Sequence, residues 1–233
     1  MNRRYIVTLS LFIPAALLIA ACSNTSKFLT EPMPESGFLP NYKLLQPVSN
    51  SSPDSRIWRY RDPAVDPNKY TSVILDSVYL NQTATKQISS QTLALVKDTL
   101  QNSMVEAVNN RGNIKIVENP GPGVARVSIG ITGAEMSNNS LQPWNFTPVG
   151  LATNAAAFVA GVNAKTPALI IESKITDSQS NQILGEGLIT IQGESFRTGS
   201  GSVEAFIEMA KKVAQQVAIC NANAINASIV VNN

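Results

Sequence analysis

The sequence predicts an α+β fold, in which a mostly antiparallel mixed sheet carries two amphipathic helices packed on one face. Apolar residues recur at spacings of three and four over residues 90–109 and again over 202–222, as on the buried side of a helix. Most of the remaining chain has β-branched or alternating apolar segments typical of strands. This order of elements, without an internal repeat, indicates a single domain over residues 37–233.

The first 21 residues predict a secretory signal. Two arginines precede an apolar run that ends at Ala21 and is too short for a comfortable membrane-spanning helix. The residues Ile19–Cys22 resemble a bacterial lipobox, which is an aliphatic residue, two small residues and a cysteine. We therefore expect cleavage between Ala21 and Cys22 and lipidation of the Cys22 sulfur. A plain secretory signal and an uncleaved anchor are the alternatives.

The residues after Cys22 predict where the lipid anchor holds the protein. One acyl chain gives marginal attachment, whereas two or three hold a protein to a bilayer almost permanently. Ser23 stands where an aspartate would signal retention in the inner membrane of many Gram-negative bacteria. We therefore expect the periplasmic face of the outer membrane. Residues 22–36 are polar and contain proline, which is typical of a flexible tether.

Three elements are expected between the tether and the first helix. The segment "GFLPNYKLLQPVSN" is too apolar for a bare linker and would lie along the surface of the domain. "IWRYRDP", residues 57–63, predicts a short strand closed by a turn. Residues 71–80, "TSVILDSVYL", have the β-branched content and the length of a central strand.

The remaining elements begin with a helix over 90–109, which Ser89 or Ser90 would cap. "NIKIVEN" then predicts a short strand, "PGPGV" a rigid turn, and "VARVSIGITGAE" a half-buried strand. "ALIIESKITD" and "ILGEGLITIQGE" flank the polar turn "SQSN" and predict a hairpin. Ser202 is a candidate cap for the last helix, and "INASIVVNN" would be a frayed end or an edge strand.

Charge and composition exclude several classes of function. Residues 1–21 contain two arginines and no acid, so the mature chain would carry 16 basic and 16 acidic residues. A neutral protein lacks the electrostatic motive for binding nucleic acid. The absence of histidine removes the Ser/His/Asp and Cys/His catalytic arrangements and the commonest zinc ligand. We expect no metal and no cofactor.

Taken in order, five motifs resemble a known family: "SGFLPNYKLLQP", "RYRDP", "YTSVILDSVYL", "NPGPGVARVSIGITGAE" and "ESKITDSQSNQIL". They are similar to the bacterial lipoproteins grouped as domain of unknown function family 3313. The resemblance covers nearly the whole mature chain and implies one outer-membrane lipoprotein domain without an assigned active site. This chain departs from the usual pattern at Ser77, where the family has proline.

Three polar residues and two glycine-containing stretches have both a functional and a structural interpretation. Asp76 lies within an apolar strand, where it would act as an acid, base or ligand contact, would cap a neighbouring loop, or would pair with Arg59, Arg61 or Arg126. Asp177 would cap the "SQSN" turn. Cys220 would be buried in the core, or would be a reactive or intermolecular thiol. "NPGPGV" lacks the helix onset that a phosphate-binding loop requires and is expected to be a rigid turn, and "GSGS" is expected to be a linker.

A further candidate is the apolar segment before Lys165, which contains no charge from Trp144 onward. As a helix it would be apolar on nearly all sides and would need a cover. That cover would be its own domain, another protein or lipid at the membrane surface. The candidate interface residues are Trp144, Phe146, Leu151, Phe158, Val159 and Val162.

These observations favour a non-enzymatic structural or accessory interaction module. It would be anchored under the outer membrane and would join a larger envelope assembly, for example the outer-membrane core of a secretion system. The alternative is a periplasmic binding module for a lipid or a small apolar ligand, with residues 144–162 lining the pocket. A hydrolase is a third hypothesis, and no nucleophile with its base can be named for it.

Overall fold

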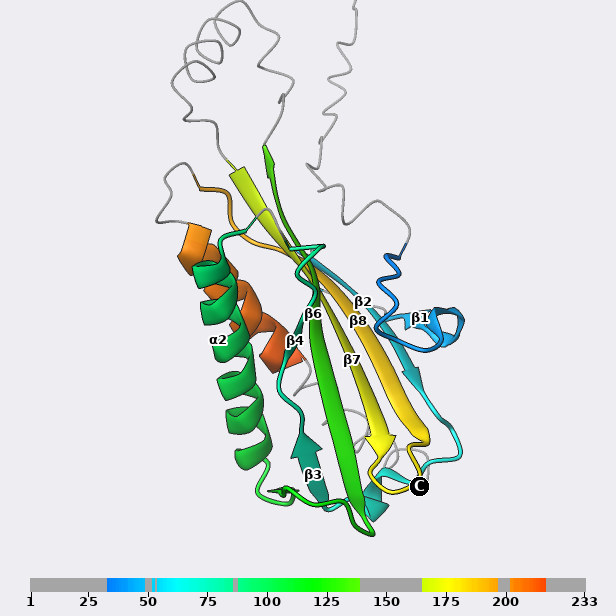
Figure 1. Ribbon diagram of the computed structural model, residues 1–233. Coiled ribbons are helices and arrows are strands. Elements are labelled where there is room, and N and C mark those ends of the chain that lie inside the picture. Colours follow the sequence, from blue (N-terminus) through cyan, green and yellow to red (C-terminus); the bar gives the residue numbers. More distant parts are fainter. Residues whose placement is uncertain are drawn as a thin grey trace, which may run out of the picture.

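The computed structural model describes residues 33–48, 52, 54–85, 88–138, 165–196 and 202–216. These residues form one eight-stranded mixed sheet with order β1-β2-β8-β7-β6-β3-β5, in which β4 also pairs with β6 (Figure 1). The strands are β1 (Gln46–Pro47), β2 (Ser55–Arg61), β3 (Ser72–Leu75), β4 (Tyr79–Leu80), β5 (Lys115–Ile116), β6 (Val124–Asn138), β7 (Lys165–Asp177) and β8 (Ile183–Gln192). Short 3-10 helices are η1 (Tyr42–Leu44) and η2 (Pro67–Lys69). The predicted α+β fold is confirmed.

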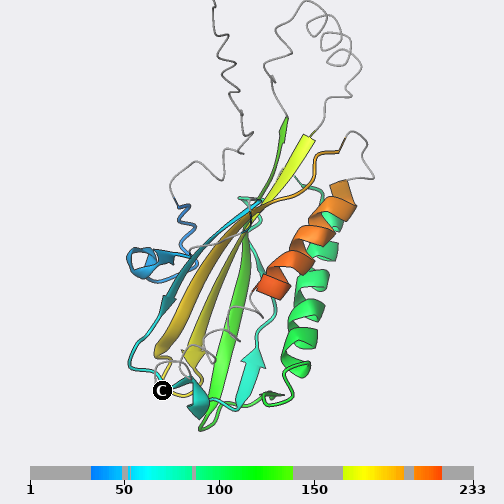
Figure 2. The same cartoon turned by 180° about the vertical axis from the view of Figure 1, so that it is seen from behind.

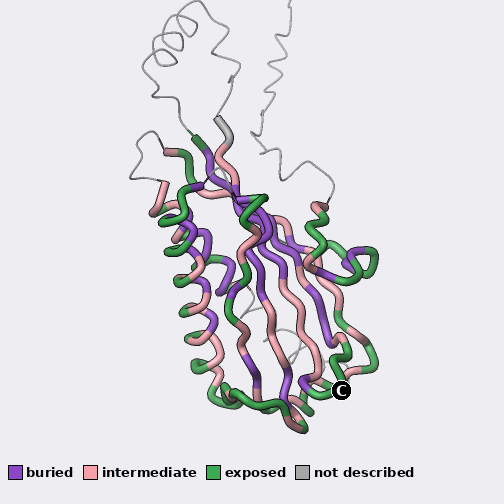
Figure 3. Tube along the Cα trace, in the orientation of Figure 1, coloured by how far each residue is buried: buried purple, intermediate pink, exposed green. Residues whose placement is uncertain are grey.

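Two helices cover the same face of the sheet, as predicted (Figures 1 and 2). They are α2 (Ser90–Asn109) and a second helix whose described part is residues 202–216. Their buried side chains form one hydrophobic cluster with strand residues such as Ile129, Leu169 and Ile189. The helix residues in this cluster include Leu93, Val96, Leu100, Met104, Phe206, Met209, Ala210 and Val213. Figure 3 shows the buried residues gathered along the strands and on one side of α2.

Local side-chain hydrogen bonds fix the start of α2 and the predicted hairpin. The hydroxyl of Ser89 accepts the backbone N–H of Thr92 at 3.1 Å, so Ser89 is the N-cap. Between β7 and β8, Asp177 Oδ1 accepts the N–H groups of Ser180 at 2.8 Å and Gln179 at 3.0 Å. These bonds lower the pKa of Asp177 and confirm its predicted role as the turn cap.

The prediction of one central strand over residues 71–80 is wrong, because the chain forms two short strands there. Both β3 and β4 run parallel to β6, with Leu75 opposite Val127 and Tyr79 opposite Gly130. The step of four residues from Leu75 to Tyr79 therefore lies beside a step of three residues in β6, from Val127 to Gly130. Residues Asp76–Val78 form the break between the two strands. The Asp76 carboxylate anchors the break through Arg126 Nη1 at 2.8 Å and Ser128 Oγ at 2.6 Å.

The prediction of a strand over residues 124–135 is confirmed, since β6 spans them, but the strand is half-buried only in its first part. β6 is buried at every position from residue 129 to residue 134. The helices cover one face of the sheet there, and a segment before β1 covers the other (Figure 2). We call this segment, residues 36–45, the strap.

The strap is held by a buried tyrosine hydroxyl. Tyr42 Oη accepts backbone N–H groups from Ser36, Gly37 and Leu39 at 3.1, 2.9 and 3.3 Å. It donates to Glu172 Oε2 at 2.6 Å, on the central strand β7. Glu172 is 0% exposed, and its Oε1 accepts the hydroxyl of Thr132 at 2.8 Å. One phenol thus joins three strap amides to a fully buried carboxylate.

Glycines in β6 make room for this arrangement. A Cβ on Gly130 would stand 3.0 Å from the Phe38 ring of the strap. A Cβ on Gly133 would stand 2.7 Å from Ile170, at the register shift that leaves Thr132 unpaired. The strap is therefore packed onto the sheet, as predicted for this apolar segment, with Leu39, Tyr42 and Leu45 buried against Leu188.

Several predictions fall outside the described residues. These are the signal and lipobox with Ala21 and Cys22, the first part of the tether, the Trp144–Val162 segment, Cys220 and the C-terminal tail.

Replacing Tyr42 with phenylalanine is expected to lower the free energy of unfolding by about 2–4 kcal/mol, because it leaves the buried Glu172 carboxylate without a donor and the strap amides without an acceptor. Urea unfolding of the domain measures the change. Tyr79→Phe is the matched control, since Tyr79 is 51% exposed and should change stability by less than about 0.5 kcal/mol. Equal stability of the two variants would contradict this role.

Candidate functional site

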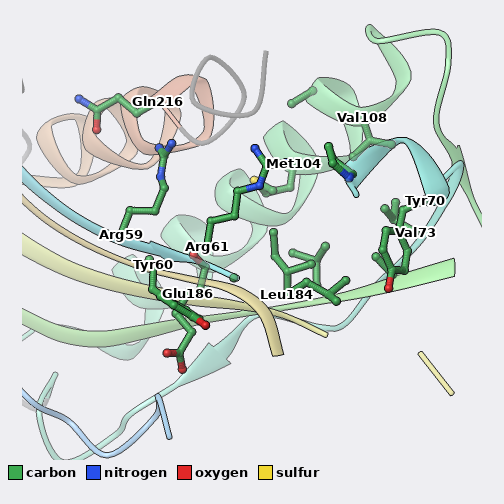
Figure 4. A pocket seen from close by; sticks show the side chains of 18 of the residues that line it. Arg59, Tyr60, Arg61, Tyr70, Val73, Met104, Val108, Leu184, Glu186 and Gln216 are labelled. Atoms are coloured by element: carbon green, nitrogen blue, oxygen red, sulfur yellow. The ribbon is translucent and has the colours of Figure 1, made fainter. Parts of the chain in front are cut away.

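A pocket of about 260 Å³ lies between the helix-covered face of the sheet and α2 (Figure 4). Strands β2, β3, β6, β7 and β8 supply its floor, and α2 supplies one wall through Met104, Ala107 and Val108. Gln216 of the second helix closes another side. Most of the lining is aliphatic, including Val73, Leu75, Ile114, Val127, Ile175 and Leu184.

Small residues on neighbouring strands leave this hollow in the floor. Gly185 and Gly187 occupy alternate positions of β8, on the face that carries Ile189 toward the helices. Ser173 lies opposite Gly187 on β7. A Cβ on Gly187 would approach the Ser173 hydroxyl to 3.0 Å, so a larger side chain could enter only by filling the pocket or shifting the strand. These small residues leave a space in the floor that larger side chains would fill in a fully packed core.

Three arginines line the apolar pocket. Arg59 and Arg61 alternate with Tyr60 on β2, so both lie on the helix-covered face, and Figure 4 shows both reaching toward the helices. Arg111 comes from the turn after α2. Burial lowers the pKa of the Arg111 guanidinium, since a partly desolvated charge is unfavourable. The site combines aliphatic walls with positive charge.

Glu186 is the one acidic residue among the described lining residues, and its carboxylate does not face the pocket. Its side chain points away from α2, toward the strap side of the sheet (Figure 4). It is 4% exposed, and neither carboxylate oxygen has a hydrogen-bond partner among the described residues. Burial raises its pKa, which the charge of the Lys174 ammonium opposes in part. Lys174 is its direct cross-strand neighbour.

The sequence-predicted site residues lie elsewhere. Asp76 pairs with Arg126, one of the three partners proposed for it, and neither lines the pocket. Asp177 caps the turn between β7 and β8, and its Oδ2 accepts a hydrogen bond from the hydroxyl of Tyr70, a pocket residue, at 3.1 Å. Residues 144–162, predicted to line a binding pocket, are outside the described chain, and the described pocket is built from other elements.

Sequence reasoning missed this pocket and the buried Glu172. The signals were an Arg-x-Arg in β2 and a Gly-x-Gly in β8, each of which places two residues on one face of a strand. Only the pairing of β2 with β8 brings them together, with Arg59 opposite Gly187 and Arg61 opposite Gly185.

The pocket lining combines two kinds of chemical group. Its aliphatic walls favour an apolar group, and guanidinium groups favour a carboxylate or phosphate. Within the described part of the chain, no three His, Cys, Asp or Glu residues are grouped to hold a metal ion. None of the described helices combines the length and apolarity that crossing a bilayer requires.

Comparisons with known proteins give a family match over most of the chain. The family model described as "Protein of unknown function (DUF3313)" matches residues 34–218. The uncharacterized lipoprotein YdcL of Escherichia coli (strain K12) is 25% identical over 202 residues, covering 86% of this chain and 89% of YdcL.

Two solved structures show weaker likeness. A DUF330 protein from Xanthomonas campestris has a TM-score of 0.40 at 10% identity, covering 71% of this chain and 93% of that chain. The PelC dodecamer from Paraburkholderia phytofirmans has a TM-score of 0.36 at 10% identity, covering 68% of this chain and 94% of that chain.

Replacing Glu186 with glutamine is expected to flatten the pH dependence of stability. Because burial raises the pKa of this carboxyl, the folded state holds the proton more tightly than the unfolded state. Its contribution to stability is complete below the ordinary glutamate pKa and is lost as the pH rises through the raised value. Urea unfolding at several values from about pH 4 to about pH 8 measures this loss.

The exposed Glu118 provides a matched control, and Glu118→Gln should leave the pH profile as in the parent protein. Parallel profiles for Glu186→Gln and the parent would show that Glu186 ionises as freely in the folded state as in the unfolded state.

Proposed function

The chain belongs to the DUF3313 family of proteins of unknown function, and we propose that it is a non-enzymatic envelope lipoprotein that binds a small apolar ligand. The observation that carries this proposal is the aliphatic pocket under α2. It favours the ligand-binding alternative that the sequence left open.

The lipid anchor is part of the proposal. The lipobox at residues 19–22 and the lipoprotein name of the relative YdcL support lipidation of Cys22 after cleavage at Ala21. Ser23 favours the outer membrane. The tether then leads directly into the strap, so an anchored domain would hang from the sheet face opposite the pocket.

An accessory interaction module in an envelope assembly is the second candidate. Strands β6 and β7 continue to pair as far as Asn138 and Lys165, beyond the last β7–β8 pair at Ala168 and Gln192 (Figure 1). Residues 193–196 continue alongside the start of β7, where Phe196 and Lys165 exchange backbone hydrogen bonds of 2.8 and 2.9 Å. The apolar sequence between β6 and β7, which includes Trp144, therefore follows the end of the sheet. This place in the chain favours contact between that segment and a protein partner, for example in a secretion system.

Filling the pocket is expected to abolish uptake of a neutral apolar dye. Ala107→Phe places a ring against the aliphatic floor, so the dissociation constant for N-phenyl-1-naphthylamine should rise at least about tenfold. Fluorescence titration of the non-lipidated domain, residues 23–233, measures it.

The matched control is Ala94→Phe, on the exposed side of the same helix. It should bind the dye as the parent does, and urea unfolding should show that both variants fold. No dye binding by the parent, or equal binding by Ala107→Phe, would refute the pocket as a ligand site.

Replacing Cys22 with serine is expected to release the protein from the membrane or to leave the signal uncleaved, because no sulfur remains to accept diacylglycerol. Cell fractionation and intact-mass measurement check this result. Cys220→Ser is the matched control and should leave processing unchanged, since the chain has only these two cysteines. If the parent protein has the mass of residues 22–233 without acyl groups, lipidation is contradicted.

The same membranes, solubilised gently and separated under native conditions, test the second candidate. A complex with other envelope proteins supports it, and a monomer alone contradicts it.

A further inference from the structure

We propose that residues 217–222, which follow the described part of the second helix, occupy this pocket in the ligand-free protein and are displaced by the ligand. This inference rests on the proposed function and adds a regulation to the same site. The segment would be an internal competitor, so the affinity that a ligand shows would depend on how firmly the segment is held. Val217 and Cys220 would be the side chains that enter the pocket.

The second helix leads directly to the pocket. Figures 1 and 2 show its described part running along the sheet toward the end where β7 and β8 join. Its last described residue, Gln216, lines the pocket and is labelled in Figure 4. The residues that follow therefore start at the pocket itself and need no linker to reach it.

The buried face of this helix continues in the sequence beyond the described part. Ala210 and Val213 are each 0% exposed and belong to the hydrophobic cluster between the helices and the sheet. Val217 and Cys220 follow Val213 at spacings of four and three, which is the helical spacing of that same face. The sequence predicts this helix as far as residue 222. Its apolar face is therefore long enough to include the pocket.

The length of the segment matches the floor of the pocket. Gly187 and Gly185 lie in successive rows of the sheet, opposite Arg59 and Arg61, and two residues of a strand span about 7 Å. Six residues of α-helix span about 9 Å, so the segment covers both rows. Because glycine has no Cβ, the backbone of a helix can approach the sheet closely at these two positions.

The segment also matches the lining in chemistry. Residues 213–233 contain no charged side chain. Burial of Val217 and Ala218 against aliphatic residues such as Leu184 removes apolar surface from water and leaves no charge unpaired. A neutral apolar ligand would be stabilised by the same walls. The segment and the ligand thus need the same space, and binding of one excludes the other.

Cys220 reports whether the segment is docked, because it is the only cysteine of the non-lipidated domain, residues 23–233. We expect saturating N-phenyl-1-naphthylamine to speed the labelling of Cys220 by N-ethylmaleimide at least about tenfold, as for a segment docked about nine-tenths of the time without ligand. Intact-mass measurement over time gives the rate. Equal rates with and without the dye, whether fast or slow, would overturn the competition.

Val217→Asp separates docking of the segment from damage to the pocket. A carboxylate on the buried face disfavours docking, so labelling of Cys220 without ligand should be at least about tenfold faster and the dissociation constant of the dye about tenfold lower. A variant that only damaged the fold would bind the dye more weakly instead. Gln215→Asp is the matched control, because it introduces the same charge at an exposed position of the same helix and should change neither quantity.

Ala107→Phe tests whether the pocket is the place where the segment docks. The added ring fills the space under α2, so labelling of Cys220 without ligand should again be at least about tenfold faster. Ala94→Phe, on the exposed side of α2, should leave the slow rate unchanged. Slow labelling of Ala107→Phe would show that the segment docks elsewhere and would overturn the inference.

The outcomes separate this inference from the function on which it rests. Dye binding that Val217→Asp leaves unchanged would overturn the competition while the ligand site stands. Dye binding by Val217→Asp and not by the parent would support docking of the segment and would remove the ligand site of the parent protein. Failure of both proteins to bind the dye would remove both.

Discussion

The Tyr42–Glu172 hydrogen bond is the contact on which the arrangement of this domain depends. A carboxylate on the middle strand of a sheet, covered on both faces, is costly unless its oxygens are satisfied. Glu172 meets that requirement through Thr132 on one side and Tyr42 on the other. The same phenol collects three strap amides, so the cost of the buried charge is offset only when the strap is in place. Glu172 thus couples the centre of the sheet to the segment that follows the tether.

The two faces of the sheet are covered by different parts of the chain. The strap closes one face, where Leu39, Tyr42 and Leu45 pack around Leu188. The described parts of the helices lie on the other face, and a pocket remains between them and the sheet. Toward the end that holds Arg61 and Arg111, glycines in β8 replace side chains, and α2 spans a hollow. The strap and the pocket therefore lie on opposite faces of the sheet.

The sequence predicted the structure correctly where a feature depends only on residues close together in the chain. The periodicity of residues 90–109, the Ser89 cap and the Asp177 turn are decided within a few residues, and the structure has them as predicted. The strand over 71–80 failed because its break is fixed by Arg126 and Ser128, some 50 residues away. Glu172 was missed because Tyr42 is 130 residues distant. The pocket needs the pairing of β2 with β8, which residue types alone do not specify.

Net charge is a poor guide to what such a pocket binds. The mature chain would be neutral overall, which argues against a polyanionic partner such as nucleic acid. Three arginines nevertheless line one apolar pocket, so the composition of a single site can differ from that of the whole chain. The lining of the pocket, rather than the net charge of the chain, is therefore what bears on its ligand, and aliphatic walls favour an apolar group.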